Sequence, residues 1–272
     1  MLPVINFKLG NIVFNADTYP IFIFISMAAG FVMSLIQLKK IGLSLKIIVF
    51  IYVSICTSFL AGARFFNFML RWDDYKRAGI SLFTLKFSYF SLYGGIMLSV
   101  LVLWLILDRF KINKLLFFDK LTIPFLTSLI IMKIGCFLNG CCYGKHTISF
   151  FSVPLPVREA EKLASSRLIN FLFNTADIRV YPTQLMEAFS SAVIILMLVI
   201  YRKKLFEGAS FFCAAILLSM ARLLILNYRS TSYSEFVLNL AYPLFYTGII
   251  ASGVWFFVIH RKNNFKKREA EA

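Results

Sequence analysis

The stretch KIIVFIYVSICTSFLAGARFFNFML, residues 46–70, decides the fold, because it is a long apolar run with Arg64 near its end. A helix needs about 20 apolar residues to cross roughly 30 Å of hydrocarbon. Further apolar runs of similar length cover residues 19–38, 91–107, 118–138, 182–201, 209–227 and 238–259. The sequence therefore predicts an all-α integral membrane fold with about seven transmembrane helices.

Composition supports this fold class. The 272 residues are 60% hydrophobic and 15% charged, whereas soluble domains carry about a quarter charged residues. We therefore expect one polytopic membrane domain over residues 1–272, without a separate soluble domain. The net charge of +16 is expected to flank the spans and meet lipid headgroups, not nucleic acid. The N-terminus lacks the pattern of a removable signal peptide, so the first span is expected to insert directly.

Charge asymmetry predicts the orientation of the spans. Alternate connections are strongly basic, and the positive-inside rule assigns them to the cytoplasm; they are 39–46, 108–120, 202–204 and the tail 260–272. The N-terminus is then outside and the C-terminus inside. The longest outer connection, residues 143–181, is predicted to form a small extracytoplasmic cap with a candidate amphipathic helix at 157–173.

Polar residues and glycines gather at the span ends that face outward in this topology. They come from five segments, namely 62–67, 91–95, 133–144, 181–187 and 222–229. Arg64, Lys133 and Arg222 fall inside apolar runs, where an ionisable side chain costs roughly 3 kcal/mol unless it faces a polar cavity. Each could instead extend to the membrane interface. Three cations on one leaflet favour a shared anionic site, and the phosphate of an anionic phospholipid suits their donors.

Gly94 and Gly95 leave two interpretations open. They allow backbone to approach a ligand near the start of a helix, where exposed N–H groups attract phosphate. They equally allow two helices to pack closely.

Three of the five cysteines, Cys136, Cys141 and Cys142, lie within seven positions. Their C-x4-CC spacing fits no standard zinc pattern, so no metal is expected. Packing residues, a disulfide on the oxidising outer side and a catalytic thiol remain open. A bridge between the adjacent Cys141 and Cys142 is strained, and a Cys136–Cys142 bridge requires the helix to end between them.

Six segments resemble, in order, the motifs of the bacterial prolipoprotein diacylglyceryl transferase family. GARFFNFMLRWDDY (62–75) resembles G-[GA]-R with its aromatic run, SLYGGIMLSV (91–100) resembles [HY]-G-G-[LI], and KIGCFLNGCCYGK (133–145) resembles G-R-x-G-x-F-x-N-G-x-x-x-G. YPTQLMEA (181–188) is similar to H-P-[ST]-Q-L-Y-E, ARLLILNYRS (221–230) to R-F-x-x-E-x-x-R, and NLAYPLFYTGI (239–249) to Q-x-L-S-x-P-[ML]-x-x-x-G. The NGCCYG variant looks like a branch of the wider family.

The resemblance implies a transferase of the bacterial cytoplasmic (inner) membrane, acting at its outer face. It would move the diacylglyceryl group of phosphatidylglycerol to a preprolipoprotein cysteine, releasing glycerol-1-phosphate, with no cofactor. The implied catalytic residues are Tyr93, Lys133 and Arg222. The implied substrate-binding residues are Arg64, Gly94, Gly95, Asn139, Gly140, Gly144, Gln184, Glu187 and Arg229.

Several positions depart from the family pattern. Lys133 stands where the signature has arginine, Tyr181 where histidine is usual, and Leu226 where glutamate is usual. The general base is left open between Tyr93 and cations that lower the pKa of the incoming thiol. A member acting on another acceptor, a non-catalytic phospholipid-binding or translocating protein, and an envelope scaffold are the alternative functions. A transporter would show repeats and mid-span breaks, which this sequence lacks.

Overall fold

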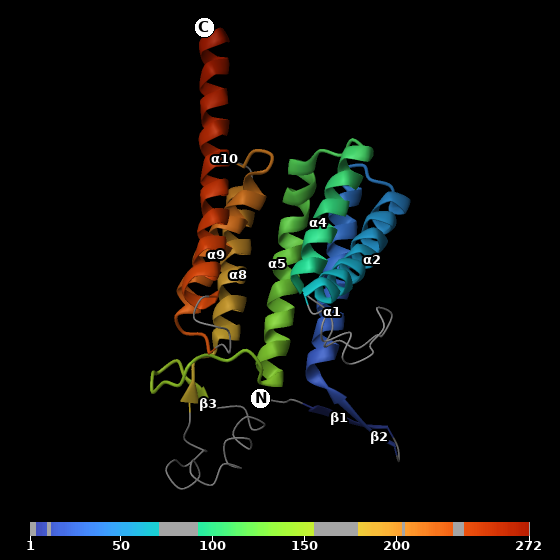
Figure 1. The fold of residues 1–272 in the computed structure, drawn as a ribbon, viewed down its shortest axis with the longest axis vertical. Coiled ribbons are helices and arrows are strands. Elements are labelled where there is room, and N and C mark those ends of the chain that lie inside the picture. Colours follow the sequence, from blue (N-terminus) through green and yellow to red (C-terminus); the bar gives the residue numbers. More distant parts are fainter. Residues whose placement is uncertain are drawn as a thin grey trace. The chain divides into compact units, whose positions relative to one another are not determined.

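Figure 1 shows the fold of a computed structural model, which describes residues 4–9, 12–70, 92–154, 179–202, 205–230 and 237–271. Long helices dominate these ranges. They are α1 (Thr18–Lys39), α2 (Leu45–Leu70), α4 (Leu92–Arg109), α5 (Lys114–Asn139), α8 (Thr183–Tyr201), α9 (Ala209–Leu226) and α10 (Tyr242–Glu271), the last preceded by the π-helix η4 (Val237–Ala241). Each coincides with a predicted apolar run.

Within the described residues, six stretches are helical, long and apolar enough to cross a membrane. They lie in α1, α2, α5, α8, α9 and the segment Asn239–Asn263. Large apolar side chains such as Phe24, Met97 and Trp255 face outward, as expected of helices surrounded by lipid. The predicted all-α integral membrane fold is therefore confirmed. α4 is not among the six, so the seventh span stays a prediction, as does the orientation.

The helices group into two compact units, residues 1–34 with 118–272 and residues 35–117, each described here by itself. The larger unit has an apolar core formed by Leu126 of α5, Ile194 and Leu198 of α8, and Ala214 of α9. α8, α9 and α10 run side by side, and α10 extends past the ends of the other two (Figure 1).

Small polar residues join α1 to α5 in the larger unit. The Ser26 hydroxyl donates to the Ser128 carbonyl at 2.8 Å, and the Ser128 hydroxyl donates to the Ser26 carbonyl at 3.0 Å. A Cβ on Gly30 would collide with the Ser128 hydroxyl. Small residues that let backbones approach are the usual means of packing helices in lipid.

Asp119 of α5 stabilises the start of α9. Its carboxylate accepts hydrogen bonds from the backbone N–H groups of Gly208 at 2.6 Å and Phe211 at 2.8 Å. The first N–H groups of a helix have no partner within the helix, so a carboxylate from a neighbouring helix satisfies them here.

The smaller unit pairs α2 with α4 through glycines. A Cβ on Gly94 would collide with Phe66 and the Gly62 carbonyl, and one on Gly95 would meet the Phe59 ring at 2.7 Å. Both glycines therefore serve close helix packing, one of the two interpretations left open. Their contact with a substrate stays a prediction.

Two small antiparallel sheets were not predicted. β1 (Val4–Leu9) pairs with β2 (Ile12–Asp17), with Val4 opposite Asp17. β3 (Val153–Pro154) pairs with β4 (Arg179–Val180), where the Arg179 guanidinium donates to Ser152. The second sheet belongs to the predicted cap at 143–181, whose candidate amphipathic helix at 157–173 lies outside the described residues. The basic tail, 260–272, continues α10 through Glu271.

Candidate active site

A buried carboxylate forms ion pairs with three cationic side chains at one end of the larger unit. Glu187, in the first turns of α8, has a side chain only 4% exposed. Its Oε2 lies 2.5 Å from Lys133 Nζ of α5 and 3.1 Å from Arg222 Nη2 of α9. Its Oε1 lies 3.7 Å from Arg229 Nη1, just beyond the end of α9. Residues of α5, α8, α9 and the segment after α9 thus form one charged group, which we call the cation cluster.

The cation cluster carries more positive than negative charge. Three cations against one carboxylate leave an excess of two positive charges among these residues. Lys133 is 7% exposed, which excludes extension of this lysine to the interface, whereas Arg222 and Arg229 are about a quarter exposed. Each of the two guanidinium groups has five N–H donors, and both share the single Glu187 carboxylate. Donors therefore remain for an anion. The arrangement can hold a phosphate.

Gly144 fixes the position of Arg229. The Gly144 N–H donates to the Tyr181 carbonyl at 2.8 Å, and the Lys145 N–H donates to the Tyr228 carbonyl at 2.8 Å. Gly144 lies opposite Arg229 in an isolated antiparallel bridge, and a Cβ on Gly144 would lie 2.5 Å from the Tyr228 carbonyl oxygen, so only glycine fits here. Tyr181 packs edge-on against the Tyr228 ring, with centroids 5.0 Å apart.

The start of α8 holds the segment that follows α5. The Thr183 hydroxyl donates to the Cys142 carbonyl at 2.7 Å, and the Gln184 amide Nε2 donates to the Cys141 carbonyl at 2.5 Å. Gln184 is 1% exposed, and its Oε1 has no hydrogen-bond partner among the described residues. Two side chains of one helix turn thus fix the backbone of both adjacent cysteines.

The three cysteines gather where α5 ends. Gly140 adopts a φ of 73°, the Gly140 N–H donates to the Phe137 carbonyl, and the Cys141 N–H donates to the Cys136 carbonyl at 3.0 Å. This is the Schellman motif, which turns the chain back over the last helical turn. The three sulfur atoms consequently all lie within 4.8 Å of one another. We call this group the thiol cluster.

The surroundings of Cys142 lower the pKa of its thiol. The neighbouring Cys136 and Cys141 side chains, and then the charges of Lys133 and Arg229, hold this pKa well below its ordinary value. Asn139 is the last residue of α5, directly before Gly140. Cys136 is buried but Cys142 is exposed, so packing does not explain all three residues.

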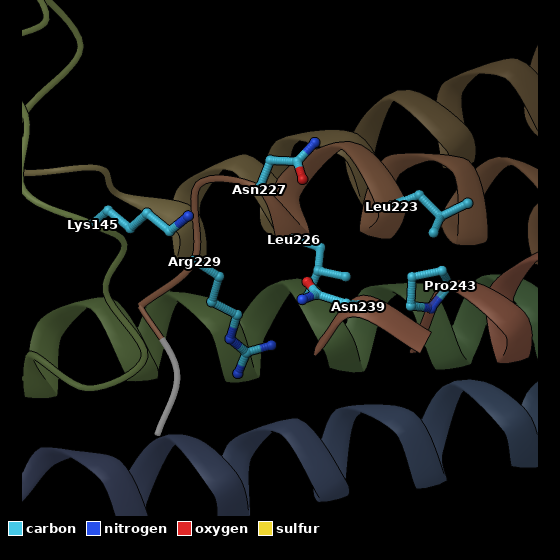
Figure 2. Close-up of a pocket in the computed structure, with 7 residues that line it drawn as sticks. All are labelled: Lys145, Leu223, Leu226, Asn227, Arg229, Asn239 and Pro243. Carbon is cyan, nitrogen blue, oxygen red and sulfur yellow. The ribbon is translucent and has the colours of Figure 1, made fainter. Parts of the chain in front are cut away.

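A pocket of about 440 Å³ opens beside the cation cluster (Figure 2). Lys145 and Arg229 line it from the connecting segments, and Leu223 and Pro243 line it from the helices on the other side. The remaining lining residues are Leu226, Asn227 and Asn239. Cationic groups at one side and apolar groups at the other match the two ends of a phospholipid. Leu226 lies between the two sides, next to Asn239 (Figure 2).

The structure brings together most of the predicted site residues. Those of the larger unit form one neighbourhood, namely Lys133, Asn139, Gly140, Gly144, Gln184, Glu187, Arg222, Arg229 and the thiol cluster. Arg64, Tyr93, Gly94 and Gly95 belong to the smaller unit. Arg64 is buried there, and the side chain of Tyr93 lies outside the described part, so their roles stay predictions.

Sequence reasoning missed Thr183 and Lys145. Thr183 lies inside the YPTQLME segment beside Gln184, and Lys145 directly follows the glycine that ends the cysteine motif. Their position next to motif residues could have indicated that Thr183 and Lys145 belong to the site. Nothing in the spacing indicated that Thr183 would hydrogen-bond a cysteine carbonyl 41 positions away.

Comparisons with known proteins show which sequences this chain resembles. The model of the prolipoprotein diacylglyceryl transferase family matches residues 5–260. Two curated proteins named phosphatidylglycerol–prolipoprotein diacylglyceryl transferase, from Streptococcus suis strains 05ZYH33 and 98HAH33, are each 28% identical over 127 residues. Each alignment covers 46% of this chain and 47% of the relative, so the chain spans about half the length of these relatives.

Proposed function

The chain belongs to the prolipoprotein diacylglyceryl transferase family, and we propose that it transfers the diacylglyceryl group of phosphatidylglycerol, or a similar anionic phospholipid, to a preprolipoprotein cysteine. The cation cluster is the observation that carries this proposal. Its two surplus positive charges lie in a multi-pass membrane protein, where unpaired charge is costly unless an anion binds.

The reaction requires charge to move toward the cation cluster. The acceptor sulfur forms a bond to the glyceryl carbon, the carbon–oxygen bond to phosphate breaks, and its electron pair leaves with the oxygen. A phosphodiester with one negative charge becomes a phosphate monoester with up to two. Arg222, Arg229 and Lys133 supply the matching positive charge, which favours the transition state over the bound lipid.

Glu187 is the positioning residue of this site. Its ion pairs hold three long cationic side chains close together, so their N–H donors are already positioned before the lipid binds. The pocket beside it suits the rest of the lipid, with Leu223, Leu226 and Pro243 against the glyceryl and acyl portion.

The localisation follows from the same proposal. The basic connections would lie in the cytoplasm, so the cation cluster would lie at the outer face of the bacterial cytoplasmic membrane. Cysteine labelling with a membrane-impermeant reagent tests this orientation. A cysteine introduced at Ile148, which is fully exposed in the cap, should add labelling from outside intact cells relative to the parent protein, and one introduced at Lys262 should not.

The test of the activity uses the purified full chain with phosphatidylglycerol micelles and a lipobox peptide. Mass spectrometry should detect the thioether and glycerol-1-phosphate. Arg222→Ala should abolish most of the product, and the matched control Lys262→Ala, at an exposed cation far along α10, should not. Phosphatidylglycerol binding without any product from wild type would instead support a non-catalytic lipid-binding protein.

A further inference from the structure

The thiol cluster has no role in the proposed transfer so far. Its three sulfur atoms come from the last turn of α5 and the two residues after Gly140, and all lie within 4.8 Å of one another. All three cysteines are free thiols in the structure. Helix packing does not require three thiol groups, which are soft metal ligands, to meet at one point.

The fold holds these sulfurs together at some cost. Cys142 has a φ of 61°, a backbone conformation that residues other than glycine rarely adopt. The hydrogen bonds from Thr183 and Gln184 to the cysteine carbonyls maintain it. Gly140 and the Schellman hydrogen bonds provide the chain reversal. Strain that several neighbouring groups support is typical of functional sites.

We propose that Cys136, Cys141 and Cys142 bind Zn²⁺ as thiolates and that the acceptor cysteine thiol occupies the fourth coordination position. The inference rests on the proposed function for its substrate. Catalytic zinc sites commonly have three protein ligands and one open position. With Zn–S bonds of about 2.3 Å, two sulfurs on one tetrahedral zinc lie about 3.8 Å apart, which small rotations of these side chains reach.

The C-x4-CC spacing alone predicts no metal site, because standard zinc patterns pair two short motifs. The helix end removes this objection. The Schellman motif folds Cys141 back over Cys136, so residues five positions apart supply ligands to the same point. Cys136 is buried and Cys142 exposed, which leaves one side of the thiol cluster open to an incoming ligand.

Zinc would supply the deprotonated acceptor that the proposed transfer needs. A free cysteine thiol has a pKa of about 8.5, and a thiol bound to zinc loses its proton to solvent. The bound thiolate then attacks the glyceryl carbon while the phosphate oxygen leaves with the electron pair of the broken bond. The zinc keeps its oxidation state, and no general base is required. This answers the question left open between Tyr93 and the cations.

Charge in the surroundings suits this arrangement. Three thiolates and one Zn²⁺ carry a net charge of −1, and the acceptor thiolate adds another negative charge. Lys133 and Arg229 act on the Cys142 sulfur electrostatically while they also pair with Glu187. Lys133 and Arg229 can therefore attract both the zinc-bound thiolates and the phosphate that leaves.

Metal content and metal spectroscopy test the proposal on the full-length protein in detergent with a reductant. We expect about one zinc per chain, lost in C136S, C141S and C142S and kept in the control C213S. After replacement of zinc by Co²⁺, the visible bands should report thiolate ligands. Addition of lipobox peptide should change them, and the same peptide with serine for cysteine should not. A cobalt spectrum that ignores the cysteine peptide would overturn the open coordination position.

Transfer assays with and without zinc distinguish a failure of the zinc site from a failure of the proposed transferase function. Chelation should lower transfer at neutral pH by at least 100-fold, and added Zn²⁺ should restore it. Full transfer by metal-free protein would overturn the zinc site while leaving the transferase intact. Zinc bound through all three cysteines with no transfer under any condition would overturn the proposed function and the acceptor role, but not the metal site. A disulfide within the thiol cluster of active protein would also overturn the inference.

Discussion

Two carboxylates of the larger unit show how differently one chemical group can be used. Asp119 accepts hydrogen bonds from two backbone N–H groups at the start of α9, and these donors are fixed by the helix. Glu187 is shared among three long cationic side chains that have donors to spare. The comparison indicates that Asp119 completes a structural contact, whereas Glu187 organises a site that still needs an anion.

Removal of the Glu187 charge should have the largest effect on stability. Glu187→Gln leaves Lys133, Arg222 and Arg229 near one another without their counter-charge, and breaking a buried pair costs about 3–5 kcal/mol. Chemical unfolding in detergent measures this loss. Inorganic phosphate should restore more stability to the variant than to wild type, because it can replace the carboxylate.

A surface ion pair provides the control for Glu187. Asp108 contacts Lys114 at 2.5 Å, but its side chain is 55% exposed. Asp108→Asn should therefore cost no more than about 1 kcal/mol. If Glu187→Gln costs as little as this control, the cation cluster is not held together by its carboxylate.

Arg229, just beyond the end of α9, should affect turnover far more than the cap residue Arg179. Arg229→Ala removes a donor that contacts Glu187 and lines the pocket, and loss of one such donor lowers kcat by about 100-fold to 1,000-fold. Arg179→Ala is the matched control, since that guanidinium is already bonded to Ser152. Kinetics with phosphatidylglycerol and a lipobox peptide measure both. Equal effects of the two variants would argue that the cap, not the phosphate contact, limits the reaction.

The sequence alone could predict the helices, because each is a predominantly apolar run of about the length of a span. It could also predict that Lys133 and Arg222 lie at one end, since both fall near span ends on the same side. Their common partner Glu187 could not be predicted, because that contact depends on how α5, α8 and α9 pack. Hydropathy does not contain this information.

The thiol cluster marks another limit of prediction. The spacing of Cys136, Cys141 and Cys142 excludes standard zinc patterns, yet the sulfurs meet because Gly140 reverses the chain. A glycine after a helical run is a known stop signal, so the helix end was predictable. The hydrogen bonds from α8 that hold the reversed segment were not, since their donors lie some 40 positions away.

Gly144 should show that backbone geometry also maintains the cation cluster. Gly144→Ala places a Cβ 2.5 Å from the Tyr228 carbonyl oxygen, so the backbone next to Arg229 must shift. We expect a loss of about 1–3 kcal/mol and reduced turnover. Gly248→Ala is the control, because nothing lies within 4 Å of its Cβ and alanine favours a helix by about 1 kcal/mol. Wild-type turnover in Gly144→Ala would contradict the role of this contact.

Asp119 should give the smallest effect and thereby test the comparison directly. Asp119→Ala leaves the N–H groups of Gly208 and Phe211 without their acceptor, and loss of a helix cap costs about 1 kcal/mol. Turnover should stay at the wild-type level, because the altered contact lies at the opposite end of α9 from Arg222 and Arg229. Phosphate should stabilise this variant no more than wild type, since no surplus cation is created. If Asp119→Ala instead lowers turnover as strongly as Arg229→Ala, the division between a structural and a functional carboxylate fails.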